Sequence, residues 1–202
     1  MARRIRTWHE GAKFHVTSRG NNRMKLFLDD EDFNKYLSIL KESKARFPFV
    51  LHAYCLMTNH THLQIDTLET PISTIMKYLN TSFAKYFNKK YSCTGHVFEK
   101  RYSAELLNSP EYEIDVSKYI HLNPVTAGIT ETPEDYPWSS YPCYVYGEIQ
   151  PLVDPTPVLS YFPDPPSQTY ENYMKSRYTD KFHWYDGKIY FIRQEESLCG
   201  LE

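Results

Sequence analysis

The chain has 202 residues, of which 41% are hydrophobic and 16% aromatic, and its formal net charge is -2. This length allows one sizeable hydrophobic core, and the apolar share excludes a chain that is disordered throughout. No stretch approaches the roughly 20 apolar residues of a membrane span, and no apolar run follows the charges at the amino terminus. We therefore expect a cytoplasmic protein.

The cysteines of the chain are expected to be reduced thiols. They lie far apart in the sequence, and none belongs to the C-x-x-C pairs that are typical of zinc and redox sites. Thiols stay reduced in the cytoplasm. The four residues are Cys55, Cys93, Cys143 and Cys199.

The net charge conceals a division along the chain. Residues 1–101 contain 17 Lys and Arg against 9 Asp and Glu, a net charge of +8, whereas residues 102–202 contain 6 against 16, a net charge of -10. A basic half can bind nucleic-acid phosphates, while an acidic half lowers the affinity for duplex in general. The alternative is that the charges only solvate two faces of the protein.

Hydrophobic periodicity divides the first 123 residues into strands and helices. An acidic run at residues 29–32 suits a helix start, Pro48 ends that helix, and Pro71 begins the next one. Only Thr58-Asn59 separates two of the strands, which favours a hairpin. The expected elements are a strand at 13–19, a helix at 30–47, strands at 49–57 and 60–66, a helix at 72–90, a strand at 96–107 and a helix from about 110 to 123.

The order strand, helix, strand, strand, helix, strand is typical of the ferredoxin-like βαββαβ fold. We therefore predict an α+β protein with an antiparallel sheet and one added C-terminal helix, which carries Tyr119. This helix is expected to end near Asn123, because a residue that precedes a proline, here Pro124, avoids helical geometry.

The composition changes after residue 141. Seven of the 13 prolines lie between Pro142 and Pro166, which predicts an extended linker that wraps the surface. Residues 168–178 can form a short helix, and the Asp-Gly pair within residues 184–190 predicts a hairpin. The sequence thus suggests one domain at residues 1–147, followed by a Pro-rich linker and a small extension at residues 148–202.

Two histidines on one strand are the first candidate site residues. Side chains alternate faces along a strand, so His60 and His62 point the same way and Thr61 points the opposite way. Two neighbouring imidazoles can bind one cation, although a short His-x-His pattern on a polar sheet face often meets only solvent. Gln64 and Asp66 continue the same polar face.

Tyr119 and Asn123 are four residues apart and share one face of the last predicted helix. If that face meets the histidine strand, Asn123 can offer its amide oxygen as a third metal ligand and Tyr119 lies beside the metal. Alone, such a tyrosine is more often a core or interface residue. His121 lies off this face, and we interpret it as structural, together with His15 and His52.

Five stretches of the sequence resemble the REP-associated tyrosine transposases, which belong to the single-tyrosine HUH superfamily of insertion-sequence transposases. Their order and spacing extend the resemblance over about residues 1–147. Thr58 stands where the family usually has proline, and Thr61 where it has an apolar residue, but Thr61 has nearly the shape of valine and neither change removes a ligand. The stretches are FHVTSRGNNR at 14–23, HAYCLMTNHTH at 52–62, GHVFEKRY at 95–102, YIHLNPVTAG at 119–128 and YPWSS at 136–140.

The resemblance implies a transposase that nicks and rejoins single-stranded DNA near hairpins, through a covalent 5′-phosphotyrosine at Tyr119. It implies that His60, His62 and Asn123 hold a divalent ion, Mg²⁺ or Mn²⁺. Such an ion is needed because a phenol of pKa about 10 is a poor nucleophile at neutral pH. The implied partner is single-stranded or hairpin DNA rather than a membrane, in a cytoplasmic, nucleoid-associated protein, and the choice between monomer and homodimer stays open.

Basic and amide side chains near the amino terminus are candidate DNA contacts, because they donate hydrogen bonds to phosphates and base edges. The alternative is ordinary surface charge. Tyr102 can stack on a base. The candidates are Arg3, Arg4 and Arg6, then Arg19, Asn21, Asn22 and Arg23, which form the favoured segment, and Arg101.

Two other functions compete with this interpretation. The first is a catalytically silent hairpin-binding protein derived from a transposase, against which the intact tyrosine, histidines and asparagine argue. The second is a metal-dependent hydrolase or a zinc-stabilised module. It would need a third strong ligand near His60, and Asp66 is the only nearby candidate.

Overall fold

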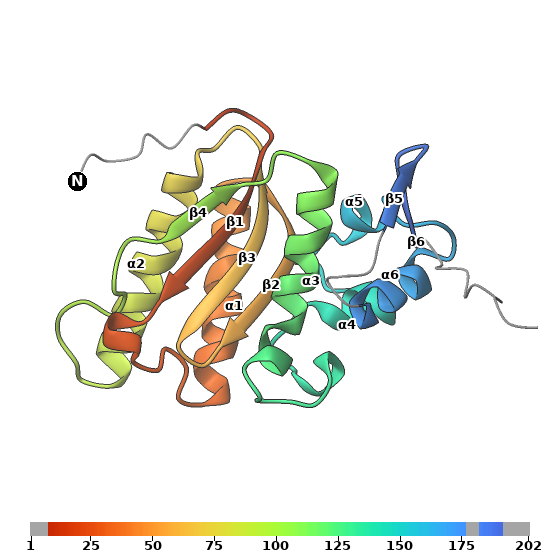
Figure 1. The fold of residues 1–202 in the computed structure, drawn as a ribbon. Coiled ribbons are helices and arrows are strands. Elements are labelled where there is room, and N and C mark those ends of the chain that lie inside the picture. The colour runs from red at the N-terminus through yellow and green to blue at the C-terminus, as the bar shows by residue number, and fades with distance from the viewer. Residues whose placement is uncertain (1–7, 177–181, 192–202) are drawn as a thin grey trace, which may run out of the picture.

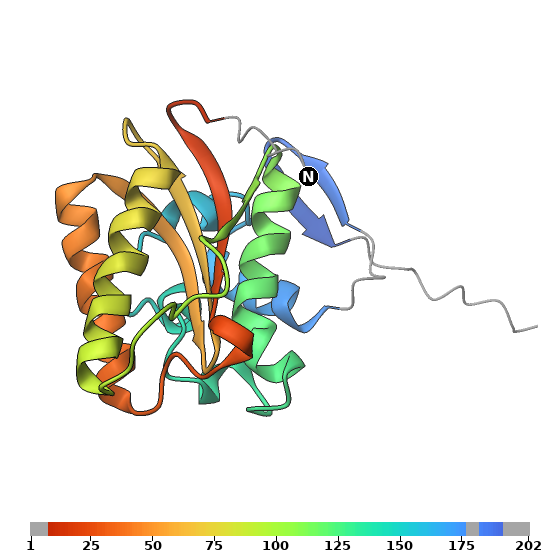
Figure 2. The same cartoon turned by 90° about the vertical axis from the view of Figure 1, so that its left-hand side faces the viewer.

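The computed structural model describes residues 8–176 and 182–191. Helices α1 (Asp30–Arg46) and α2 (Ile72–Lys90) cover one face of a four-stranded sheet, and α3 (Pro110–Thr126) lies against the other face (Figure 1). Figure 2 shows the sheet between these two layers. No helix in the described part of the chain is long and apolar enough to cross a membrane.

The sheet has the order β2-β3-β1-β4, and every neighbouring pair is antiparallel. This order confirms the ferredoxin-like α+β fold that the sequence predicts. The first helix, the β2–β3 hairpin and the second helix also lie where their patterns place them. The strands are β1 (Ala12–Arg19), β2 (Phe49–Met57), β3 (His60–Thr67) and β4 (Ser103–Leu106).

The first hydrophobic core lies between the sheet and helices α1 and α2. Alternate residues of β1 and β3 point into it, as the period of a half-buried strand requires. Thr61 is on this face, where its hydroxyl lies 3.4 Å from that of Tyr36, so the polar atom that departs from the family pattern has a local partner. Strand residues of this core include Phe14, Val16, Leu63 and Ile65, and helix residues include Tyr36, Leu40, Leu79 and Phe83.

The second core joins β2 and α3 to the segment after residue 140. This segment forms α4 (Tyr141–Val145), α5 (Thr156–Leu159) and α6 (Pro166–Lys175), which pack behind α3 (Figure 1). The C-terminal segment therefore shares a hydrophobic core with α3. Its members include Cys55, Met57, Ile114, Ile120, Tyr144, Val158, Phe162 and Tyr170.

Residues 138–154 run along β2, the outer strand of the sheet. The amide of Leu56 donates to the carbonyl oxygen of Trp138 at 2.9 Å, and the amide of Asp154 donates to that of Leu51 at 2.8 Å. These bonds occupy backbone groups that an edge strand would otherwise expose. This part of the Pro-rich segment thus covers the edge of the sheet, while its helices α4 and α5 pack into the second core.

The predicted C-terminal hairpin is also present. It comprises β5 (Phe182–Tyr185) and β6 (Lys188–Phe191), which pair antiparallel. Asp186 and Gly187 have φ of +47° and +71°, the left-handed geometry that an Asp-Gly turn favours. The amide of Ile189 donates to the carbonyl oxygen of Tyr161 at 2.8 Å, which attaches the hairpin to the C-terminal segment.

The strand expected at residues 96–107 is wrong over its first half, because β4 spans only Ser103–Leu106. Its partner β1 ends at Arg19, so residues 97–99 have no straight strand to pair with. They bond instead to the turn that follows β1. The amide of Asn21 donates to Val97 and that of Glu99 donates to Arg19, both at 2.9 Å.

The predicted end of α3 at Asn123 is also wrong, because the helix continues through Pro124 to Thr126. A proline inside a helix costs one hydrogen bond. Here only the last turn is affected, and the amides of Ala127 and Ile129 still donate to the carbonyl oxygens of Asn123 and Pro124. The burial of Asn123 holds it in helical geometry against the local preference.

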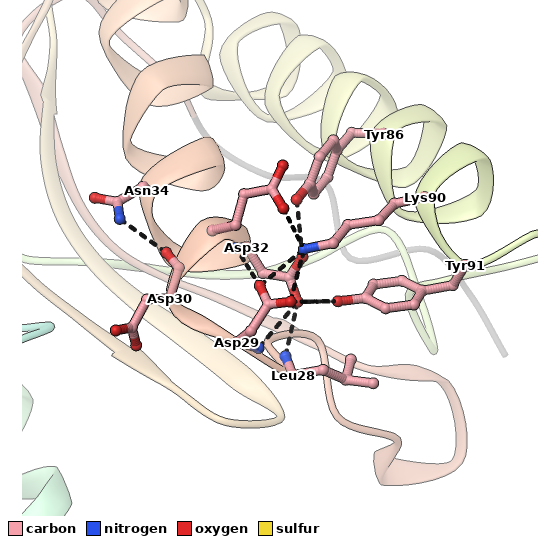
Figure 3. Close-up of polar contacts among 9 residues, drawn as sticks. Leu28, Asp29, Asp30, Asp32, Asn34, Tyr86, Lys90 and Tyr91 are labelled. Atoms are coloured by element: carbon pink, nitrogen blue, oxygen red, sulfur yellow. Dashed lines mark hydrogen bonds and ion pairs between the residues drawn. The ribbon is translucent and has the colours of Figure 1, made fainter.

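A buried carboxylate ties α1 to α2 (Figure 3). Asp29 and Asp32 form a capping box at the start of α1. The fully buried Asp32 also accepts hydrogen bonds from the hydroxyls of Tyr86 and Tyr91, at 2.9 and 2.7 Å, and from the Lys90 ammonium at 2.9 Å. One side chain thus joins the two helices that form the first core.

We expect Asp32→Asn to lower the free energy of unfolding by about 2 kcal/mol at pH 7, the scale of hydrogen bonds to a charged group. Burial raises the pKa of Asp32, but the hydrogen bonds from Tyr91, Lys90 and others outweigh it and hold this pKa below its ordinary value. A carboxylate with a lowered folded-state pKa stabilises the fold above its unfolded pKa, about 3.9, and this contribution is lost as the pH falls through the folded value. Urea unfolding should therefore show a difference between the proteins that is full at pH 7 and shrinks below about pH 4.

Asp30→Asn is the matched control. Asp30 is an exposed carboxylate in the first turn of the same helix, so its loss removes only a small helix-dipole contribution. Equal destabilisation by the two substitutions, or a difference that does not depend on pH, would contradict the role of Asp32.

Candidate active site

The two histidines of β3 and the amide of α3 lie together. β3 begins at His60, directly after the two-residue turn, so His60 and His62 face α3. Their ring centroids are 4.9 Å apart. Nδ1 of His60 lies 2.6 Å from the side-chain oxygen of Asn59, and His60 is also hydrogen-bonded to the side chain of Asn123. The structure thus brings together the three predicted metal ligands.

His62 has one ring nitrogen engaged and one free. Its Nδ1 lies 2.9 Å from Nε2 of His15. Its Nε2 is buried and has no hydrogen-bond partner among the described residues. Buried polar atoms are normally paired, so an unpaired ring nitrogen beside His60 is a position that a cation can fill.

His15 belongs to this cluster, although the sequence interpretation treated it as structural. Its ring stacks on that of His62 with the centroids 5.2 Å apart. The pairing of Thr17 with His62 in the β1–β3 ladder places His15 on the same sheet face. The alternation of β1 puts His15 in phase with Lys13 and Arg19 on its polar face, and this was the signal available in the sequence.

The surroundings keep these imidazoles neutral near pH 7. Burial lowers the pKa of His62, and repulsion from the other ionisable groups of the cluster, His15 and His60 in their protonated forms and the Arg19 guanidinium, lowers it further. Burial and Arg19 also lower the pKa of His60, against the hydrogen bond with Asn123, and burial lowers the pKa of His15 to about 4. Neutral imidazole is the form that binds a metal ion.

Tyr119 lies beside the histidines, one turn before Asn123 on α3. Its ring meets that of His62 edge to face with the centroids 5.4 Å apart, and that of His15 at 5.8 Å. The side chain is 45% exposed, so a molecule arriving from solvent can reach it. A phenol, two imidazoles and an amide therefore lie together in one patch, of which the phenol is exposed.

The opposite side of α3 is fixed by buried polar contacts. The ammonium of Lys118 donates to the carbonyl oxygens of Tyr173 and Ser176 at 2.7 and 2.8 Å. The two ring nitrogens of His121 each lie 2.8 Å from a hydroxyl, those of Tyr170 and Ser140. His121 is therefore structural, as predicted. His52 is as well, since it is buried and its Nδ1 lies 3.2 Å from a backbone oxygen of the C-terminal segment.

The favoured DNA-contact segment lies next to the histidines. Arg19 pairs with His60 across the β1–β3 ladder, and both Arg19 and Arg23 are exposed. The 3-10 helix η1 (Asn21–Arg23) turns the chain sharply, with Asn22 at φ +47°. A Cβ at Gly20 would lie 2.2 Å from the carbonyl oxygen of Met24, so this tight turn requires glycine.

The remaining predicted DNA contacts lie elsewhere. Arg101 is exposed in the loop before β4, and its carbonyl oxygen accepts a hydrogen bond from Asn80 at 2.8 Å. Tyr102 is only 6% exposed and packs in the first core, so the prediction that it stacks on a base is wrong. Residues 1–7, which include Arg3, Arg4 and Arg6, lie outside the described residues.

The donor set suits a weakly chelated divalent ion rather than a structural zinc. Within the described ranges, no group of three or more His, Cys, Asp or Glu side chains can hold a metal ion. Asp66 is four residues beyond His62 on β3, about 13 Å along the strand, so it cannot join the histidines. Two imidazoles and one amide oxygen leave room for water or a phosphate oxygen.

Comparisons with known proteins identify the family of this chain. The chain matches the family model described as "Transposase IS200 like" over residues 9–123, more than half of its length. It is 28% identical, over 163 residues, to a Haemophilus influenzae protein that carries the name REP-associated tyrosine transposase, with 75% of this chain and 92% of that protein covered. Its fold is similar to that of a REP-associated tyrosine transposase solved bound to a REP hairpin. The TM-score is 0.62 and the identity 18%, with 76% of this chain and 89% of that chain covered.

The family match runs from just before β1 to Asn123 and includes both histidines of β3 and Tyr119. The resemblance stated from the sequence motifs is therefore confirmed by independent comparisons of sequence and fold. The chain belongs to the IS200-like transposase family.

Proposed function

We propose that this transposase nicks and rejoins single-stranded DNA beside a hairpin, with Tyr119 as its nucleophile. A divalent ion would be held by His60, His62 and Asn123. The observation that carries the proposal is the contact of the Tyr119 ring with that of His62, which lies beside His60 and has a buried Nε2 with no partner among the described residues. The similar fold solved with a REP hairpin supports hairpin DNA as the partner.

The reaction exchanges one phosphate ester for another. The phenol oxygen of Tyr119 attacks the phosphorus and loses its proton, the bond from phosphorus to the 3′ oxygen breaks, and that oxygen leaves as a hydroxyl. The 5′ phosphate stays on the tyrosine. Because a phosphodiester becomes a phosphotyrosine ester, a free 3′ hydroxyl can reverse the step without ATP.

Each residue of the patch has a part in this reaction. When bound, the ion withdraws charge from the phosphate and helps to align it with the phenol. His60 and His62 offer neutral nitrogens and Asn123 an amide oxygen, a set that suits Mn²⁺ and tolerates Mg²⁺. His15 fixes the orientation of the His62 ring, as outer-sphere partners of metal ligands do.

The DNA contacts remain those predicted from the sequence, apart from Tyr102. Arg19 lies next to His60, so it is placed to hold a phosphate near the one that reacts. The proposed contact residues are Arg3, Arg4, Arg6, Arg19, Asn21, Asn22, Arg23 and Arg101.

Tyr119→Phe should abolish the covalent protein–DNA adduct on a single-stranded hairpin oligonucleotide while leaving the dissociation constant nearly unchanged. The substitution removes one oxygen from a half-exposed ring and keeps the ring. Denaturing gels with labelled DNA measure the adduct, and fluorescence anisotropy measures binding. Tyr146→Phe, at another exposed tyrosine, is the control. An adduct that persists in Tyr119→Phe contradicts the assignment, and a wild-type protein that binds DNA without forming an adduct is the silent binder.

His60→Ala and His62→Ala should each remove most Mn²⁺ binding and DNA nicking, with little effect on the melting temperature. Neither side chain contributes apolar packing on the scale of the two cores. Isothermal titration with Mn²⁺ and nicking assays with and without chelator measure the effects, with the exposed His9→Ala as control. Undiminished nicking by both variants in chelator would refute the metal site.

His15→Phe should weaken Mn²⁺ binding about 10–100-fold, the usual effect of losing an outer-sphere partner of a metal ligand. Phenylalanine keeps a ring against His62 but offers no hydrogen-bonding nitrogen. His15→Gln places an amide near the position of Nε2 and should restore part of the affinity. If all three proteins bind Mn²⁺ equally, His15 does not orient His62.

A further inference from the structure

A groove of about 1970 Å³ lies between α2 and the segment at residues 95–106. Figure 2 shows this segment running beside α2 before it enters β4. The groove lies mostly on the α1 and α2 side of the sheet, at the edge formed by β4, whereas Tyr119 and the histidines are on the α3 side. It is therefore separate from the candidate active site.

Four exposed cations line this groove, Lys77 and Lys85 from α2 and Lys100 and Arg101 from the loop. None of the four forms an ion pair with any residue in the described ranges. Two carboxylates, Glu99 and Glu105, also line it, and Glu105 is hydrogen-bonded to Tyr112. The groove thus keeps a surplus of unpaired positive charge that an anionic ligand would neutralise.

The wall formed by α2 carries hydrogen-bond donors at a regular spacing. Ser73, Lys77, Thr81 and Lys85 follow one another every four residues and so lie on one face of the helix. Lys77 and Lys85 are about 12 Å apart along the axis. A row of ammonium and hydroxyl groups of this length suits a chain of phosphates better than a single small anion.

The opposite wall is held in place by two asparagines of α2. The side-chain amide of Asn80 donates to the carbonyl oxygen of Arg101 at 2.8 Å, and that of Asn88 donates to Gly95 at 3.1 Å. Both ends of the basic loop are therefore fixed to the helix. A preformed groove binds a flexible ligand with less loss from ordering of the protein.

The loop also connects the groove to the candidate active site. Gly20 and Phe98 form an isolated β-bridge, and the amide of Glu99 donates to the carbonyl oxygen of Arg19 at 2.9 Å. Arg19 in turn lies beside His60. Single-stranded DNA that leaves the histidines and passes Arg19 can therefore turn around the end of β1 and enter the groove.

We propose that this groove binds the backbone of the single-stranded DNA that continues from the reactive phosphate, outside the hairpin. The inference rests on the proposed function and adds a second binding site to it. Lys77 and Lys85 contact two separate phosphates along α2, while Lys100 and Arg101 contact phosphates from the loop. The contacts are electrostatic, so the groove increases affinity without reading sequence.

The test compares hairpin oligonucleotides that carry either no flank or a flank of about 12 unpaired nucleotides. For each protein, anisotropy gives the ratio of the two affinities. In the wild type, we expect the flank to increase the affinity on the order of tenfold. In Lys77→Gln/Lys85→Gln, this increase should be lost. The salt dependence for the flanked DNA should flatten by about 1.4 in log–log slope, because each phosphate contact on a single strand contributes about 0.7.

Lys35→Gln/Lys41→Gln, two lysines of α1 outside this groove, is the control with the same change of charge, and it should keep the gain. The proposal fails if the Lys77 and Lys85 variant keeps the wild-type gain, if the wild type gains nothing from the flank, or if a duplex flank gives the same gain. The adduct formed through Tyr119 is scored separately with the wild type on the flanked hairpin, because only this DNA contains a phosphodiester beside the hairpin that can be cleaved. A missing adduct would overturn the proposed function. The ratio of the affinities for flanked and flankless DNA tests separately whether the groove binds the flank.

Discussion

Helix α3 packs between the sheet and the C-terminal segment, and this packing fixes the rotation of the helix about its axis. The geometry of the candidate site depends on that rotation. The ammonium of Lys118 is buried, so each of its bonds to the end of α6 must be kept or the charge is left without compensation. Successive helix residues are about 100° apart. A rotation that kept Lys118 buried elsewhere would therefore turn Tyr119 and Asn123 away from the histidines of β3. The contacts of α3 with the C-terminal segment therefore determine whether Tyr119 and Asn123 face the histidines.

The contacts that fix α3 come largely from residues outside the family match, which ends at Asn123. Residues 138–154 cover the β2 edge, and α4, α5 and α6 complete the second core behind α3. The chain therefore supplies its own cover for the back of the helix that carries Tyr119. Tyrosine, histidines and amide meet within one chain in this arrangement.

Local periodicity predicted which candidate residues share a face of their strand or helix, and it failed where the position of a residue depends on partners distant in the sequence. His60 and His62 share a face because strands alternate, and Tyr119 and Asn123 share one because helices repeat every 3.6 residues. His15 joins them only through the β1–β3 register, which no local pattern contains. Arg101 is exposed whereas its neighbour Tyr102 is buried, a difference that the sequence did not indicate. The strand predicted at residues 96–107 is shorter in the structure because its partner β1 ends at Arg19. At Pro124, packing of the last helical turn overrides a local rule.

The distribution of charge explains how a chain with a net charge of -2 can bind DNA. Charges in salt solution act over about 10 Å at 0.1 M, so a phosphate in the proposed groove would interact mainly with the four cations and two carboxylates that line it rather than with the net charge of the whole chain. The basic half also divides its charges between two tasks. Lys90, at the end of α2, is paired with Asp29, Glu31 and Asp32 and stabilises the fold. Lys77 and Lys85, earlier on the same helix, have no such acid within the described residues and remain able to bind phosphate. The net charge of this chain therefore does not indicate whether it can bind DNA. Whether each cation is already paired with an acidic residue is more informative.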